Sequence, residues 1–190
     1  MVTGLFFGSF NPIHIGHLII AQAVLAQAKL SDVWFVVSPQ NPHKSSKSLA
    51  HEFDRLKMVE YAIEGNDRFK AVDIEFHMPK PSYTVDTLAW LREKYPSRAF
   101  KLIIGEDNLT SFKKWKNHQV ILDDFGLLVY PRPGKHNVKF NEHSNVVYLE
   151  APMLNISATY IRKCVKEDRS IRYLVSESTA QYIRDRKLYL

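Results

Sequence analysis

The sequence predicts an α/β fold in which helices cover both faces of an open, mainly parallel sheet. Short apolar runs alternate along the chain with longer segments of helical period, which is the pattern of parallel strands joined by crossover helices. The chain has 190 residues, 45% of them hydrophobic, and this length and composition suit one compact domain with an ample core. We therefore expect one domain over residues 1–190, with a helical C-terminal part at about 152–190.

The apolar runs place strands at residues 2–7, 33–37, 69–74, 100–104, 126–130 and 146–148. The helical period places helices at residues 15–28, 52–64, 84–94, 107–114, 120–124, 157–167 and 178–186. Two polar stretches, 38–53 and 131–145, interrupt the alternation and are predicted to be loops. Because ligands of open α/β sheets bind beyond the carboxyl ends of the strands, we expect Lys44, Lys47 and Arg132 in these loops to lie near a ligand.

Charge and cysteine content narrow the class of partner and the compartment. The chain has 26 Lys and Arg against 20 Asp and Glu, a net charge of +6, which favours anionic partners such as nucleotides. Cys164 is the single cysteine, which excludes an internal disulfide and a cysteine-based zinc cluster and fits a reducing cytoplasm. No signal peptide and no apolar stretch of the ~20 residues that span a bilayer is seen, so we expect a cytoplasmic protein without a membrane partner.

The stretch GSFNPIHIGH, residues 8–17, directly follows the first strand. Gly8 and Pro12 predict a short turn into a helix, whose free amide groups and dipole attract anions. His14 and His17 are three residues apart and share one helix face, so that two imidazoles could flank one anion. Surface histidines beside a simple turn are the plain alternative. A zinc site is a third reading, but catalytic zinc takes three protein ligands and no HExxH helix is present.

A second stretch, ISATYIR at residues 156–162, opens a predicted helix near the other end of the chain. Ser157 is the expected N-cap, Thr159 lies in the first turn and Arg162 lies one turn further. A capped helix with no ligand explains the serine alone. Two hydroxyls and a guanidinium within one turn also form a phosphate clamp, because arginine makes bidentate contacts with phosphate oxygens.

Together the two stretches resemble the HxGH and ISxTxxR motifs of the nucleotidyltransferase superfamily, in the same order along the chain. The resemblance implies a Rossmann-like fold and adenylyl transfer, with His14 and His17 at the ATP α-phosphate. It also implies a set of ATP-binding residues, namely Gly8, Ser9, Phe10, Ser157, Thr159 and Arg162. Asn11 departs from the aspartate that is common in this family, and we expect little consequence because it is also a short polar turn residue.

The segments between the motifs, SPQNPHK, PSYTVDTL, IIGEDNL, KKWKN and YPRPG, resemble the bacterial nicotinate-nucleotide adenylyltransferase family. This resemblance implies further ATP contacts from Gly105 and Asp107. It implies substrate contacts from Lys44, Tyr83, Thr84, Trp115 and Arg132, with Trp115 stacked on a pyridine ring and the amides around Thr84 facing a carboxylate. Without it, Thr84 is a helix cap and Trp115 a buried ring. Near the C-terminus, Ser176 replaces the family's proline, which predicts a less rigid start of the last helix.

The implied reaction joins nicotinate mononucleotide and ATP by direct in-line attack on the α-phosphorus, giving nicotinate adenine dinucleotide and pyrophosphate. No protein nucleophile is needed, and Mg²⁺ is expected to arrive with ATP, since this ion prefers substrate phosphates and water. The rivals are a pantetheine-phosphate adenylyltransferase, a nicotinamide-preferring enzyme and a binding module that has lost catalysis. No basic aromatic platform with RNP spacing is seen, so we expect no nucleic-acid partner. A monomer and a homo-oligomer are both left open.

Overall fold

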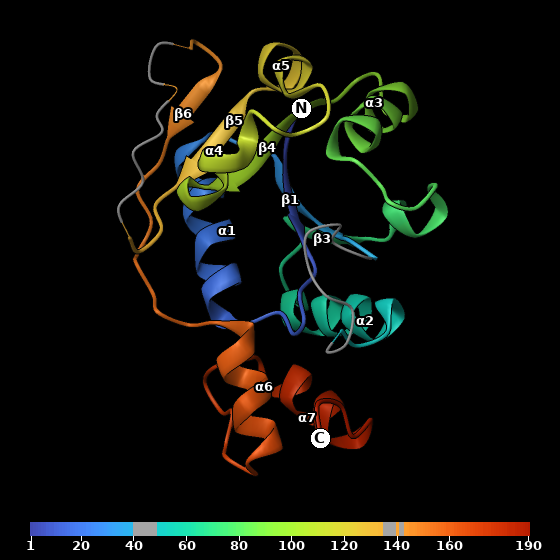
Figure 1. The fold of residues 1–190 in the computed structure, drawn as a ribbon, viewed down its shortest axis with the longest axis vertical. Helices are drawn as coiled ribbons and strands as arrows, with labels where there is room; N and C mark the ends of the chain where they lie inside the picture. Colours follow the sequence, from blue (N-terminus) through green and yellow to red (C-terminus); the bar gives the residue numbers. More distant parts are fainter. Residues whose placement is uncertain (40–48, 135–139, 141–142) are drawn as a thin grey trace.

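The computed structural model describes residues 1–39, 49–134, 140 and 143–190 of the chain. Its strands form one six-stranded sheet in the order β3-β2-β1-β4-β5-β6 (Figure 1). All neighbouring strands of this sheet pair in parallel. The predicted α/β class is therefore confirmed.

The strands lie close to their predicted positions: β1 (Val2–Gly8), β2 (Asp32–Val37), β3 (Phe69–Val72), β4 (Ala99–Gly105), β5 (Leu127–Tyr130) and β6 (Val146–Tyr148). The α-helices are α1 (Ile15–Gln27), α2 (Glu52–Ile63), α3 (Thr84–Lys94), α4 (Glu106–Phe112), α5 (His118–Val120), α6 (Ala158–Lys166) and α7 (Glu177–Asp185). A 3-10 helix, η2 (Ile74–His77), and a π-helical segment, η3 (Ile121–Phe125), complete the regular structure.

Alternating side chains of the central strands enter two separate hydrophobic clusters, one on each face of the sheet. Phe6 of β1 and Phe35 of β2 pack in the cluster that contains residues of α1, α2, α6 and α7. Leu5 and Trp34, their neighbours in the sequence, pack in the cluster that contains residues of α3, α4 and η3. Burial on both faces explains why these strands read as nearly continuous apolar runs.

The strand order reverses direction at β1. From β1 the chain crosses over through α1 to β2, which pairs on one side of β1, whereas β4, reached through α3, pairs on the other side. Consecutive crossovers that leave in opposite directions open a crevice beyond the carboxyl ends of the two central strands, here β1 and β4, where open α/β sheets bind ligands.

The C-terminal helices α6 and α7 form one end of the molecule, below α1 and α2 in Figure 1. Ile161 and Ile183 belong to the same buried cluster as α1 and α2, and the Thr179 hydroxyl donates to the Met58 carbonyl at 3.2 Å. Ser176 caps α7 by accepting the Thr179 amide at 3.2 Å, so the position that carries a proline in the family has a side-chain cap. No helix in the described ranges is long and apolar enough to cross a membrane.

Three predicted boundaries are wrong by two residues, and one of them is the end of the helix expected at 107–114, which lies at Phe112. The third strand ends at Val72, not residue 74, because Ile74 begins η2, which turns the chain away from the sheet. The helix expected at 120–124 instead starts at His118 and passes into the π-helical turn η3. Asn117 precedes it in the left-handed conformation, with φ of 48°, a backbone state that asparagine adopts more easily than most residues and that apolar periodicity does not reveal.

Candidate active site

The loop that follows β1 is built around the ring of Phe10, which is 2% exposed. A Cβ atom on Gly8 would lie 2.8 Å from this ring, so the position requires glycine. The ring also meets the His17 ring edge-on, with centroids 5.2 Å apart. The Phe10 side chain is therefore part of the core. Only the backbone atoms of this residue are available for the predicted contact with ATP.

His14 and His17 lie face to face at the start of α1. Their ring centroids are 3.7 Å apart with an interplanar angle of 23°. The His14 amide donates to His17 Nδ1 at 3.2 Å, and this bond leaves the proton of a neutral His17 ring on Nε2. The predicted shared face is thus present, and one backbone bond fixes the orientation of the second ring.

The His14 ring is buried and neutral at ordinary pH. Its side chain is 6% exposed, and within the described chain its Nδ1 has no hydrogen-bond partner. Burial and, secondarily, the positive charge of Arg132 lower its pKa from 6.5 to about 4. A neutral imidazole can donate one hydrogen bond to a phosphate, whereas the positive charge at this point comes from the arginine.

The helix α6 brings the second motif to the first. Ser157 is its N-cap, as predicted, and accepts the Tyr160 amide at 3.2 Å. Arg162 Nη1 donates to the Asn11 carbonyl at 2.7 Å, and Nη2 donates to the Thr159 hydroxyl at 3.3 Å. Two segments 151 residues apart in the sequence are thereby joined at the carboxyl edge of the sheet.

Gly105, Asp107 and Arg132 meet beside the end of β4. Gly105 is the N-cap of α4, and a Cβ atom there would lie 3.1 Å from the Tyr130 ring. Arg132 Nε lies 3.7 Å from Asp107 Oδ1, too far for a hydrogen bond, and its guanidinium stands 5.4 Å from the centre of the Tyr130 ring. Arg132, two residues after β5, therefore places its positive charge near both Asp107 and His14.

A cavity of about 350 Å³ opens between β1, β4 and the start of α3. The predicted residues that line it are Gly8, Ser9, Tyr83, Thr84, Gly105 and Trp115. Trp115 is half-buried in the turn after α4, as expected of a ring at the rim. Thr84 is the first residue of α3 and not its cap, because Tyr83 occupies the N-cap position. The Tyr83 side chain makes no capping bond, which leaves the first amide groups of α3 for a ligand. Lys44 lies outside the described residues.

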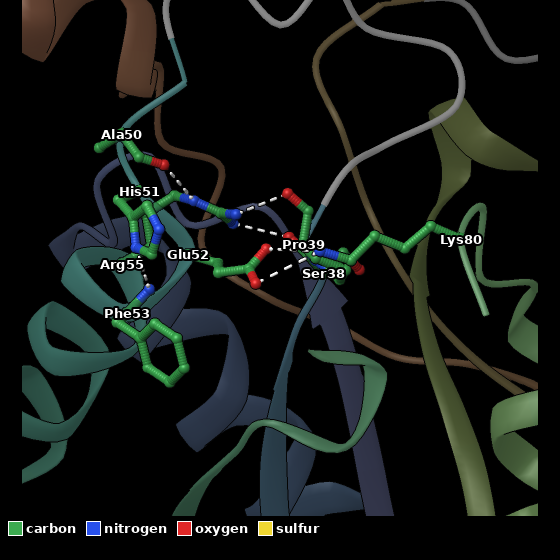
Figure 2. A network of polar contacts seen from close by, with 8 residues as sticks. All are labelled: Ser38, Pro39, Ala50, His51, Glu52, Phe53, Arg55 and Lys80. Carbon is green, nitrogen blue, oxygen red and sulfur yellow. Dashed lines mark hydrogen bonds and ion pairs between the residues drawn. The ribbon is translucent and has the colours of Figure 1, made fainter. Parts of the chain in front are cut away.

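Sequence reasoning missed Arg55, which organises the loops around this cavity (Figure 2). Its side chain is fully buried and donates to the carbonyl oxygens of Ser9 and Ser38 at 2.7 Å, Pro39 at 2.8 Å and Ala50 at 2.9 Å. Burial lowers its pKa. The sequence did contain a clue to its role. Position 55 lies on the buried face of α2 with Met58 and Val59, and a buried arginine needs hydrogen-bond partners inside the protein.

Tyr189, near the C-terminus, was also missed. Its hydroxyl donates to Asn11 Oδ1 at 2.9 Å, and burial raises its pKa. Nothing in the spacing of the sequence indicates a contact between residues 178 positions apart. The described residues contain no group of three His, Cys, Asp or Glu side chains that could hold a metal ion.

A family model and several known proteins match this chain. A model of the cytidylyltransferase-like family matches residues 5–164. A protein of Cytophaga hutchinsonii, described as a probable nicotinate-nucleotide adenylyltransferase, is 58% identical over 189 residues, covering 100% of this chain and 98% of that protein. One of Christiangramia forsetii with the same description is 48% identical over 98% of this chain and 97% of its own length.

Solved structures share the fold. The nicotinic acid mononucleotide adenylyltransferase of Plasmodium falciparum, complexed with NaAD, superposes with a TM-score of 0.82 at 20% identity, covering 99% of this chain and 97% of that one. The same enzyme complexed with APC gives a TM-score of 0.80 at 18% identity, covering 99% and 96%. Since the family model covers most of the chain and the bacterial relatives match along its whole length, the chain belongs to the cytidylyltransferase-like family, among the nicotinate-nucleotide adenylyltransferases.

Proposed function

We propose that the chain transfers the adenylyl group of ATP to the phosphate of nicotinate mononucleotide, releasing nicotinate adenine dinucleotide and pyrophosphate. The observation that carries the proposal is the contact between the two phosphate-binding motifs, where Arg162 bonds the Asn11 carbonyl at 2.7 Å. That contact puts the start of α6 beside the paired histidines. The descriptions of the bacterial relatives support the same substrates.

In the proposed reaction an oxygen of the mononucleotide phosphate attacks the α-phosphorus of ATP. The new P–O bond forms as the bond from the α-phosphorus to the bridging oxygen breaks, and pyrophosphate leaves with the electron pair. His14 and His17 donate hydrogen bonds to the α-phosphate oxygens, and Arg132 supplies positive charge next to them. Donors fixed in advance stabilise the transition state without reorganisation, and phosphoryl-type transfer depends mainly on such positioning.

The leaving pyrophosphate is assigned to the start of α6. Ser157 and Thr159 present hydroxyls there, and Arg162 is already oriented by its bonds to Asn11 and Thr159. Mg²⁺ enters as part of the substrate, bound to ATP, because it prefers phosphate oxygens and water as ligands. The adenosine half is assigned to Gly105 and Asp107 beside the end of β4.

The mononucleotide half is assigned to the 350 Å³ cavity. Trp115 stacks on the pyridine ring, and the first amides of α3, at Tyr83 and Thr84, bind the ring carboxylate. The amide group of nicotinamide carries no negative charge and would gain less from this helix N-terminus. Lys44 is proposed to meet substrate phosphates.

The test is pyrophosphate release from ATP and Mg²⁺ with either nicotinate or nicotinamide mononucleotide. Faster release with nicotinate mononucleotide is expected. Faster release with the amide would contradict the substrate assignment, and release with neither would favour a binding module without catalysis.

The role of the histidines is tested by replacing one of them. His17→Ala is expected to lower kcat by about 10²–10³-fold, the usual cost of one transition-state donor, with little change in Tm. His77→Ala, on η2 with its side chain 71% exposed, is the control and should keep its kcat. An unchanged kcat in His17→Ala would remove that ring from the mechanism.

A further inference from the structure

Glu75 is a buried carboxyl group that the proposed chemistry does not use. It lies on η2, is 3% exposed, and lines the same cavity as Tyr83, Thr84 and Trp115. Burying a carboxylate without a partner lowers the free energy of unfolding by several kcal/mol. Its partner therefore indicates what the group is for.

The hydrogen-bond partner of Glu75 is a hydroxyl group of α3: Thr87 Oγ1 donates to Glu75 Oε1 at 2.9 Å. Ser38 and Ser82 line the same cavity. Burial is the larger influence on the carboxyl and raises its pKa, while the side chains of Ser38, Thr87 and Ser82 oppose that rise. Ser38 follows β2, Ser82 precedes α3, and Thr87 lies in the first turns of α3.

Thr87 lies in the first turn of α3, directly after the residues that face the cavity. Its hydrogen bond therefore ties the turn that begins at Tyr83 and Thr84 to the buried carboxyl group. Ser38, on the same cavity wall, donates its own amide to the Gly8 carbonyl at 2.9 Å. The wall around Glu75 therefore includes the carboxyl ends of β2 and β1 as well as the start of α3.

The segment has little else to hold it at its exposed end. Tyr83 is 41% exposed and makes no side-chain cap. Its ring lies 4.8 Å from Lys116 Nζ, which is itself paired with Asp86 at 2.8 Å on the surface, and surface pairs contribute little. The hydrogen bond from Thr87 to Glu75 is the stronger restraint, because it is buried and leaving a buried polar group unpaired costs about 1–3 kcal/mol.

We propose that Glu75 is a positioning residue for the pyridine carboxylate: through its hydrogen bond with Thr87 it fixes the first turn of α3, whose residues Tyr83 and Thr84 line the cavity. The inference rests on the proposed function and adds to it a residue that does not touch the adenosine half. Loss of Glu75 should therefore weaken the binding of nicotinate mononucleotide and leave the binding of ATP unaffected.

The experiment compares Glu75→Ala and Glu75→Gln with the wild type. KM for each substrate, kcat, Tm and the calorimetric Kd for nicotinate mononucleotide are measured on the full chain. In Glu75→Ala, KM and Kd for nicotinate mononucleotide should rise about tenfold, the effect of roughly one lost buried hydrogen bond, while KM for ATP stays within about twofold. Glu75→Gln, which keeps one acceptor oxygen, should show a smaller rise in the same direction.

Glu93→Gln is the matched control, because this carboxyl is exposed on α3 itself, and its constants should equal those of the wild type. If Glu75→Ala fails to fold, the same measurements are made on Glu75→Gln and on Thr87→Val. The second of these removes one hydrogen-bond donor with little change of shape. Equal rises in both KM values, or a fall of kcat that only follows Tm, would overturn the positioning role. A lower KM for nicotinate mononucleotide in Glu75→Gln would also overturn it, because Glu75 would then repel the substrate. A wild type without turnover would overturn the proposed function itself, whereas turnover with unchanged constants overturns only the role of Glu75.

Discussion

The buried His14 ring makes the stability of the protein depend on pH in a defined window. Its pKa is lowered from 6.5 to about 4 by burial and by the charge of Arg132. Between these values the unfolded chain binds a proton that the folded chain does not. The free energy of unfolding contributed by His14 is therefore fully present above about pH 6.5 and is lost as the pH falls towards about 4.

The size of the effect follows from the two pKa values. At about pH 5 the His14 ring is mostly protonated in the unfolded chain and mostly neutral in the folded chain. This difference lowers the free energy of unfolding by roughly 2 kcal/mol relative to about pH 7.5. The full loss, below about pH 4, is roughly 3 kcal/mol.

Urea unfolding at about pH 7.5 and pH 5, on the wild type and on His14→Gln, isolates this contribution. Glutamine keeps an N–H donor and does not titrate, so the variant should lose about 2 kcal/mol less than the wild type between the two pH values. Equal losses in both proteins, within about 0.5 kcal/mol, would refute the reasoning. An NMR titration of the ring gives an independent check, and an ATP analogue should raise the measured pKa because phosphate charge favours the imidazolium.

Two further predictions concern arginines that bind backbone carbonyls. Arg55→Met should lower the free energy of unfolding by about 3–5 kcal/mol, since it leaves buried acceptors unpaired. Arg92→Met, which breaks a surface pair, should cost about 0–1 kcal/mol; a similar loss in both would contradict the role of Arg55. Arg162→Lys keeps the charge but loses the planar guanidinium, so KM for ATP should rise about tenfold. The exposed Arg186→Lys is the control and should keep its KM for ATP. An unaltered KM in Arg162→Lys would mean that the planar guanidinium does not bind ATP.

The sequence was sufficient for the fold because the information is local. Each central strand is buried on both faces, so the run around Leu5 and Phe6 is apolar without interruption, and each helix shows its own period. The site was predicted less completely. Ser157 could be recognised as a cap from its neighbours alone, whereas the contact of Arg162, on the same helix, with the loop after β1 could not, since no spacing indicates a contact over 151 residues.

The parts that escaped prediction depend on burial in three dimensions. The histidine motif suggested groups that neutralise phosphate charge, but a ring that is 6% exposed beside Arg132 is neutral. Glu75 likewise appears in the sequence as one more acidic residue after a strand. Its importance depends on the depth at which η2 places it and on the Thr87 hydroxyl that α3 brings to it.

Asn11 shows how one position can tolerate a departure from its family. Its carbonyl accepts Arg162 at 2.7 Å, and its Oδ1 accepts both the Ala50 amide at 3.0 Å and the Tyr189 hydroxyl at 2.9 Å. Both side-chain bonds require an acceptor oxygen, which asparagine and aspartate each supply. The residue is 6% exposed, and burying a neutral amide costs less than burying a carboxylate. The asparagine therefore joins the loop after β1 to the start of α2 and to the C-terminus without placing a negative charge beside the proposed phosphate site.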